Sequence, residues 1–129
     1  MPSAGITALF AAYADALNDF DAGAIVDLFA FPNTIWQFGK GHVFADADDL
    51  LENVETLLKA FDGAGVVTSS FHLDSSHCLE TGSSAHATAS WTQQDAEGET
   101  IHAFRCTYLL LLDNGELFIA SVVNEPEDD

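Results

Sequence analysis

Basic residues are scarce in this sequence. Three Lys and Arg residues stand against 21 Asp and Glu residues in a chain of 129, which gives a formal net charge of −18. A field of this sign repels the phosphates of nucleic acids and the anionic surfaces of membranes. We therefore expect neither nucleic acid nor a membrane among the partners of this protein.

Long apolar runs and cysteines are also few. The longest aliphatic run, Leu109–Leu112, is far shorter than the roughly 20 residues of a membrane-spanning helix, and the N-terminus has no basic, apolar leader. The two cysteines, Cys78 and Cys106, do not form a Cys-x-x-Cys pair and are expected to be reduced thiols. Zinc spacings, phosphate-binding glycine loops and nucleophile elbows are missing. We expect a cytoplasmic protein with no metal and no cofactor.

Three segments in the first half show helical periodicity. Apolar residues recur at three- and four-residue steps from Ile6 to Phe20, which predicts a first helix with one buried face. Asp21 is typical of an N-cap, and the apolar residues at 25–29 predict a short second helix that Pro32 ends. Asp46 precedes a third helix that reaches Gly63.

The remaining segments are typical of strands. Residues 34–38 and 42–44 predict a short hairpin, and ranges 66–79, 84–94, 101–112 and 116–124 predict four long strands joined by turn-rich segments. The pattern indicates one α+β domain over residues 1–124, with an acidic tail at 125–129.

One local match points to a family. The segments Tyr13–Asn18 and Ile25–Ala30 resemble the first two helices of the bacterial ketosteroid isomerases, and the order of elements resembles the nuclear transport factor two-like superfamily, which includes the SnoaL-like cyclases. This resemblance implies a cone-shaped, curved antiparallel sheet wrapped by three N-terminal helices. It marks the fold more than the activity.

The isomerase site is incomplete in this sequence. The resemblance places the oxyanion-binding tyrosine on Tyr13, the catalytic aspartate on Gln37 and the second oxyanion donor on Thr107. Glutamine cannot act as a base, so one of the three parts remains. We do not expect steroid isomerisation.

Strand alternation, with tight turns and Thr107 pointing inward, divides the sheet into two faces. The expected concave face carries His72, Asp74, Ala87, Ala89, Trp91, Arg105, Thr107, Leu109, Phe118, Ala120, Val122 and Asn124. The expected convex face carries Phe71, Leu73, His77, His86, Thr88, His102, Phe104, Cys106, Tyr108, Leu110, Ile119 and Val123.

Three helices can cover one face, so we expect a homodimer through the apolar convex face, centred on Phe104, Tyr108, Leu110 and Ile119. The row of His77, His86 and Tyr108 beside Cys106 fits such an interface better than a metal site.

Arg105, the one arginine, leaves two interpretations open. It forms an internal ion pair with Asp74, near Asn124, or it points into the cone with Tyr13 and holds a ligand oxygen. His72 is either a proton carrier beside Asp74 or a solvated residue near the sheet edge.

We expect a small hydrophobic or anionic molecule in the cone. The candidate catalytic residues are Tyr13, His72, Asp74 and Arg105. The candidate ligand-binding residues are Trp36, Gln37, Trp91, Thr107, Phe118, Val122 and Asn124. The function is then that of a cofactor-free lyase, isomerase or cyclase, or that of a non-catalytic dimeric module that binds a metabolite or a protein.

Overall fold

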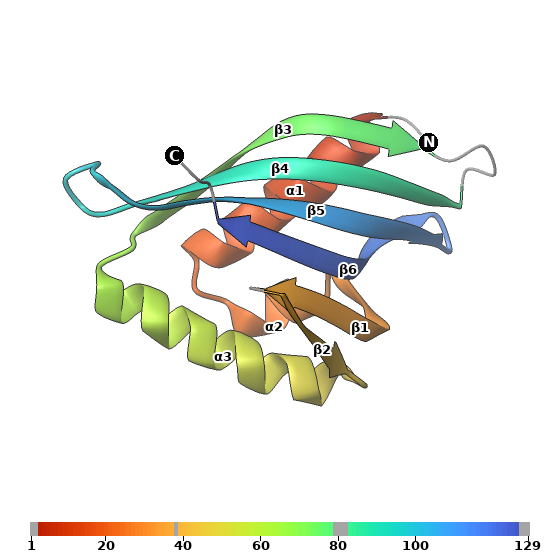
Figure 1. The fold of residues 1–129 in the computed structure, drawn as a ribbon, viewed down its shortest axis with the longest axis horizontal. Helices are drawn as coiled ribbons and strands as arrows, with labels where there is room; N and C mark the ends of the chain where they lie inside the picture. The colour runs from red at the N-terminus through yellow and green to blue at the C-terminus, as the bar shows by residue number, and fades with distance from the viewer. Residues whose placement is uncertain (1–2, 38, 79–82, 127–129) are drawn as a thin grey trace.

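The computed structural model describes residues 3–37, 39–78 and 83–126 (Figure 1). In chain order the elements are α1 (Ser3–Asn18), α2 (Ala22–Val26), β1 (Phe29–Gln37), β2 (Lys40–Phe44), α3 (Ala47–Ala64), β3 (Thr68–Cys78), β4 (Ser84–Gln94), β5 (Thr100–Asp113) and β6 (Glu116–Pro126). The α+β class, with three helices ahead of four long strands, is confirmed. Strand β6 continues to Pro126, two residues into the expected acidic tail.

The six strands form one sheet in the order β2-β1-β6-β5-β4-β3. Strands β3 to β6 form the expected antiparallel meander, but β1 runs parallel to β6. The sheet is therefore mixed, not antiparallel throughout, because the first hairpin returns to the sheet beside the last strand. Figure 1 shows α1 behind the long strands and α3 along the side of β1 and β2.

The ends of the helices follow the capping residues. The side chain of Asp46 accepts the backbone N–H of Asp49 at 3.0 Å and begins α3, and Gly65 ends this helix with a left-handed φ of 90°. Helix α2 was predicted to reach Phe29, but it ends at Val26. Phe29 instead pairs with Ile119 of β6, so tertiary pairing outweighs the local helical pattern.

Each hairpin of the meander contains a shift of register. The shifts lie between Leu73 and Ser75, between Gln93 and Gln94, and between Leu109 and Leu110. A one-residue shift moves every following side chain to the other face of a sheet. The face on which a residue lies therefore depends on which side of a shift it occupies.

These shifts correct the predicted faces. The face that packs on the helices, called the inner face below, carries Phe71, Leu73, Ala87, Ala89, Trp91, Gln93, Phe104, Cys106, Tyr108, Leu110, Ile119, Val122 and Asn124. The predictions for Ala87, Ala89, Trp91, Val122 and Asn124 are thus confirmed. The outer face carries residues that were expected inside: His72, Asp74, Arg105, Thr107, Leu109 and Phe118.

The core lies between α1 and the inner face. Phe10 of α1 contacts Phe71 and Tyr108, with ring centroids 5.9 and 4.8 Å apart. Tyr108, Leu110 and Ile119 are 2%, 0% and 0% exposed, so the residues proposed as the centre of a dimer contact are core residues instead. The predicted contact was wrong because the shift between Gln93 and Gln94 reverses the faces of β5.

Candidate functional site

Four polar side chains gather within the core between α1 and the inner face. They are Tyr13, Trp91, Cys106 and Tyr108. The indole Nε1–H of Trp91 donates to the hydroxyl of Tyr108 at 2.8 Å, and the thiol of Cys106 forms a hydrogen bond with the same hydroxyl. Tyr108 therefore holds the centre of this polar cluster.

Tyr13 differs from the other members because its hydroxyl is free. Its half-buried ring packs between Phe29 and Trp91, with centroids 5.9 and 5.3 Å away. In the described ranges the Tyr13 hydroxyl has no hydrogen-bond partner. Asn33 Oδ1 is the one fully buried side-chain polar atom there that lacks a partner, so the Tyr13 oxygen is not fully buried. The Tyr13 hydroxyl can therefore donate to an acceptor that reaches it.

The cluster stays uncharged near neutral pH. Burial, and next the Cys106 thiol, raises the pKa of Tyr13 above its ordinary value. Burial raises the pKa of the Cys106 thiol to about 11, and burial raises the pKa of Tyr108 as well. The hydroxyl of Tyr13 is thus a neutral donor, which suits an uncharged acceptor such as a carbonyl oxygen.

A second polar cluster lies on the outer face of the sheet. Asp74 Oδ2 is 3.3 Å from Arg105 Nε, and Asp74 Oδ1 is 3.0 Å from His72 Nδ1. The hydroxyl of Ser90 donates to Asp74 at 2.5 Å. The hydrogen bonds from Ser90 and His72, followed by the charge of Arg105, lower the pKa of Asp74. The Arg105 side chain is 50% exposed and that of His72 is 82% exposed.

The ion pair is the interpretation of Arg105 that the geometry supports. Arg105 was expected inside the cone as a ligand anchor or as one partner of a buried pair, and the structure places it in an exposed pair on the opposite face. His72 and Asp74 lie there as well. The candidate proton carriers are therefore separated from Tyr13 by the sheet.

Replacing Arg105 with methionine should leave the melting temperature nearly unchanged, because exposed ion pairs contribute little to stability. Differential scanning calorimetry checks this, with Lys59→Met on the exposed side of α3 as the control. A loss as large as that of a core substitution would contradict the exposed position of the pair.

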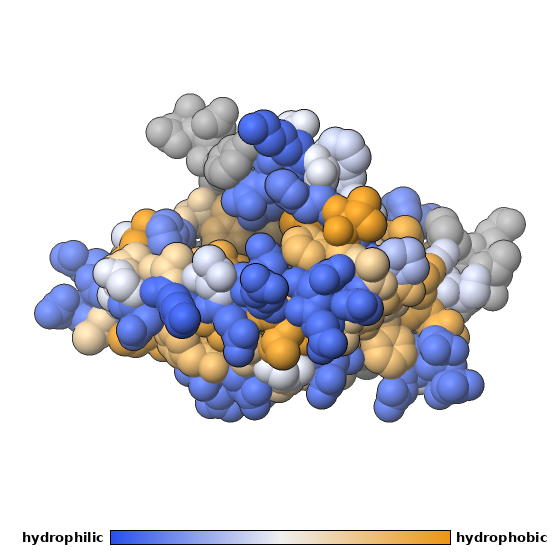
Figure 2. Space-filling model, turned by 90° about the horizontal axis from the view of Figure 1, so that it is seen from below, coloured by the Kyte–Doolittle hydropathy of each residue, from blue (hydrophilic) through white to orange (hydrophobic). Residues whose placement is uncertain are grey.

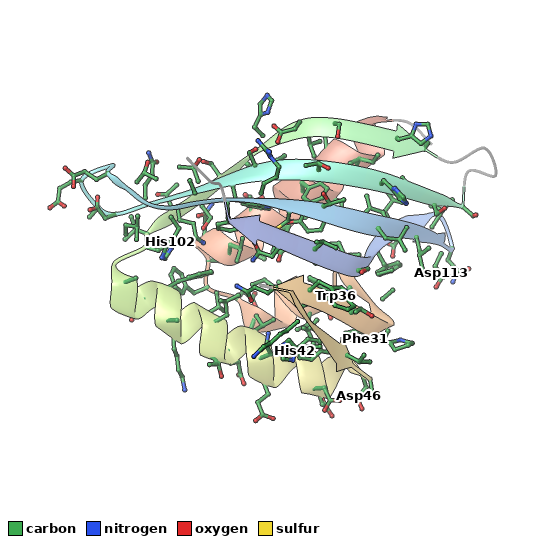
Figure 3. The ribbon with its side chains drawn as sticks, in the orientation of Figure 1. Phe31, Trp36, His42, Asp46, His102 and Asp113 are labelled. Atoms are coloured by element: carbon green, nitrogen blue, oxygen red, sulfur yellow. The ribbon has the colours of Figure 1, made fainter. Side chains whose placement is uncertain are left out.

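The other candidate binding residues divide between the two faces. Val122 is buried and Asn124 is half-buried beside Cys106 on the inner face. Trp36 is 46% exposed, and its ring lies over Gly41, 2.8 Å from the position of an added Cβ (Figure 3). The remaining candidates are also accounted for. Thr107 bonds to Thr88 at 3.2 Å on the outer face, Phe118 pairs with Leu111 there, and Gln37 is exposed at the end of β1.

A family model for "NTF2-like protein (DUF6841)" matches residues 3–127. The chain belongs to this NTF2-like family. No match was found among curated proteins. Within the described part of the NTF2-like chain, no group of three or more His, Cys, Asp or Glu residues is arranged to hold a metal ion. Among the helices of that part, none has the length and apolar content of a membrane-spanning segment.

Solved structures share the NTF2-like fold at low sequence identity. A ketosteroid isomerase-like protein from Erwinia carotovora atroseptica is 18% identical, with a TM-score of 0.73 over 98% of this chain and 96% of its own. An NTF2-like protein of unknown function from Shewanella oneidensis is 16% identical, with a TM-score of 0.75 over 96% and 98%. A domain with a cystatin-like fold from Nostoc punctiforme is 14% identical, with a TM-score of 0.78 over 100% and 81%. These similarities show the fold.

The NTF2-like chain also has a surface groove, between the α1–α2 turn and α3. It has a volume of about 870 Å³ and is lined by Asp19, Phe20, Asp21, Ala22, Gly23, Leu51, Glu55, Leu58, Lys59 and Asp62. Figure 2, which looks at the molecule from the α3 side, shows hydrophilic residues around smaller hydrophobic patches. The groove is open, four of its ten lining residues are acidic, and none of them belongs to the polar cluster around Tyr108.

Proposed function

We propose that this protein binds a small, uncharged, largely apolar molecule between α1 and the inner face of the sheet. The free hydroxyl of Tyr13 carries the proposal, because it is a donor without a partner in the described chain. The rings of Phe29 and Trp91 contact the Tyr13 ring, with centroids 5.9 and 5.3 Å away, and make its surroundings apolar. A ligand oxygen that accepts from Tyr13 while its rings contact these aromatics satisfies both features.

The charges favour an uncharged ligand over an anionic one. The chain has three Lys and Arg residues in all. They are Lys40, Lys59 and Arg105, and each of them is exposed. Arg105 is already paired with Asp74 on the outer face. A buried carboxylate ligand would therefore lack a cationic partner, at a considerable free-energy cost. The observations thus favour a hydrophobic, uncharged ligand over an anionic one.

Binding has more support than catalysis. Proton abstraction needs a base within reach of the reacting carbon, and the described core contains no buried Asp or Glu. His72 and Asp74 lie on the outer face, and Gln37 stands where the resemblance expects an aspartate. A cofactor-free lyase, isomerase or cyclase would need another proton carrier, so we propose a binding domain.

A thermal-shift assay with 1-tetralone and tetralin tests this proposal. The two probes share their rings, but only 1-tetralone has a carbonyl to accept from Tyr13. A ligand at about a hundred times its dissociation constant stabilises the native state by roughly 2.7 kcal/mol, a shift of several degrees. Tyr13→Phe should weaken 1-tetralone binding about 2- to 12-fold, the range of one hydrogen bond.

Thr107→Val is the matched control, because it removes a hydroxyl from the outer face. We expect this variant to bind 1-tetralone like the unmodified protein. Equal binding of tetralin and 1-tetralone, or no change in Tyr13→Phe, would contradict the proposed role of the Tyr13 hydroxyl.

The homodimer also remains a proposal, with a different contact from the predicted one. Trp36 and Val123 are neighbours across β1 and β6 on the outer face, and they are 46% and 39% exposed. Exposed apolar side chains of this kind are common at contacts between subunits. Sedimentation at micromolar concentration should show a dimer that Trp36→Lys weakens. A folded monomer at these concentrations would rule it out.

A further inference from the structure

Two histidines lie opposite each other on the hairpin of β3 and β4. In the antiparallel register His77 is the direct partner of His86. Ala85 and Ala87, on either side of His86, are 0% and 1% exposed and belong to the inner face. Because side chains alternate along a strand, His77 and His86 both point to the outer face, and both are exposed.

The row of residues that the sequence predicted around these histidines is only partly formed. Tyr108 and Cys106 lie in the core on the inner face, and β5 places Leu109 opposite His86 instead. The sheet therefore separates the two histidines from the phenol and the thiol. An ion bound by the pair would be held by two imidazoles and by groups from solvent.

The two imidazoles are not engaged by other side chains. Within the described ranges neither ring of the pair has a hydrogen bond or an ion pair. Other histidines of the sheet differ, since Nδ1 of His72 is 3.0 Å from Asp74 Oδ1 and Nδ1 of His102 is 2.9 Å from Gln93 Oε1. Each neutral imidazole of the pair thus has a ring nitrogen whose lone pair is free to bind a ligand.

The spacing of the pair suits a metal ion. Residues directly opposite each other in antiparallel strands have Cβ atoms about 4.5–5.5 Å apart. Two nitrogens that bind one tetrahedral ion at about 2.0–2.1 Å lie about 3.3 Å from each other. Imidazoles from the two strands can therefore converge on one ion while the backbone keeps its register. Since one ladder fixes both rings, the second nitrogen binds at a high effective concentration.

We propose that His77 and His86 form a two-histidine site for a divalent transition-metal ion at the β3 edge of the sheet. Imidazole nitrogens suit Zn²⁺, Cu²⁺ and Ni²⁺, whereas carboxylates suit Mg²⁺ and Ca²⁺. The net charge of −18 attracts cations to the chain. Water or a small ligand completes the coordination. The site lies on the face opposite Tyr13, so it does not depend on the proposed function.

Calorimetric titration of the chelator-treated protein with Zn²⁺ tests the site, because Zn²⁺ has no redox chemistry that would oxidise the thiols. We expect one Zn²⁺ per chain. Either His77→Gln or His86→Gln should weaken this binding about 100-fold, since each variant removes one of two linked ligands. His42→Gln, an exposed histidine on β2, is the matched control and should bind Zn²⁺ like the unmodified protein. Circular dichroism checks that all three variants are folded.

Long-range ¹H–¹⁵N spectra of the imidazoles locate the ion independently of the variants. The ring signals of His77 and His86 should shift together on addition of Zn²⁺, while those of His42 and His72 stay in place. Mg²⁺ should shift neither pair. If only one of the two variants weakens binding, the histidines do not act together and the inference is wrong. Binding that both variants retain, or that follows His72 and Asp74 instead, would also overturn it.

Discussion

Replacing Trp91 with alanine should lower the free energy of unfolding by about 3–5 kcal/mol, the usual cost of removing a buried aromatic side chain. Trp91 is 2% exposed and contacts Tyr13 and Phe71, with centroids 5.3 and 5.6 Å away. The substitution also removes the donor to the Tyr108 hydroxyl. Guanidinium denaturation followed by circular dichroism measures the change.

The other tryptophan is the control for this prediction. Trp36 is 46% exposed on the outer face, so Trp36→Ala should change the free energy of unfolding by less than about 1 kcal/mol. Similar losses for both variants would contradict the assignment of Trp91 to the inner face and Trp36 to the outer face.

Replacing Asn33 with aspartate should cost about 3–5 kcal/mol at neutral pH, because it buries a charge without a partner. Asn33 is fully buried, and its Nδ2 donates to the carbonyls of Ala30 and Ile119 at 3.1 and 2.8 Å. A carboxylate cannot donate to these oxygens, so the link between β1 and β6 would be lost. Chemical denaturation at pH 7 measures the effect.

The cost of Asn33→Asp should depend on pH. Burial raises the pKa of the new carboxyl in the folded state. The penalty is therefore present above the unfolded-state pKa of about 3.9 and diminishes as the pH falls towards it. Asn53→Asp on the exposed side of α3 introduces the same charge in water and should be nearly neutral at both pH 7 and pH 5. Equal stability of the two variants at pH 7 would show that Asn33 is not buried as described.

The order of elements could be predicted from the sequence because it depends on local signals. Asp46 and Gly65 mark the ends of α3 through caps that a sequence shows directly. The parallel pairing of β1 with β6 and the early end of α2 could not be predicted. Both depend on contacts between residues that are some 90 positions apart, such as Phe29 and Ile119.

The faces of β5 explain why the predicted site residues Arg105 and Thr107 lie on the outer face of the sheet. The prediction assumed tight turns and put Thr107 inside, and the shift between Gln93 and Gln94 reverses that choice. The sequence held a contrary signal, since Phe104, Cys106 and Tyr108 are residue types that are often buried, while Arg105 is charged and Thr107 is polar. A charged side chain favours the solvated face, so this alternation indicates the observed orientation.

Tyr13 was predicted from the family resemblance, and its side chain packs against the core. Because Tyr13 belongs to helix α1, its position does not depend on the register of the strands. The hydrogen bond between Gln93 and His102 could not be predicted. These residues are paired only because the register shift falls next to Gln93, and no residue type marks its place.

The central claim, that a ligand binds beside Tyr13, is tested most directly by an NMR titration with 1-tetralone. The chain has two tryptophans, so its indole N–H signals report on both faces at once. We predict that the signal of Trp91 shifts with the backbone amides of Tyr13 and Cys106, while that of Trp36 stays in place. Shifts confined to Phe20, Leu51 and Leu58 of the groove along α3, or no shifts at all, would contradict it.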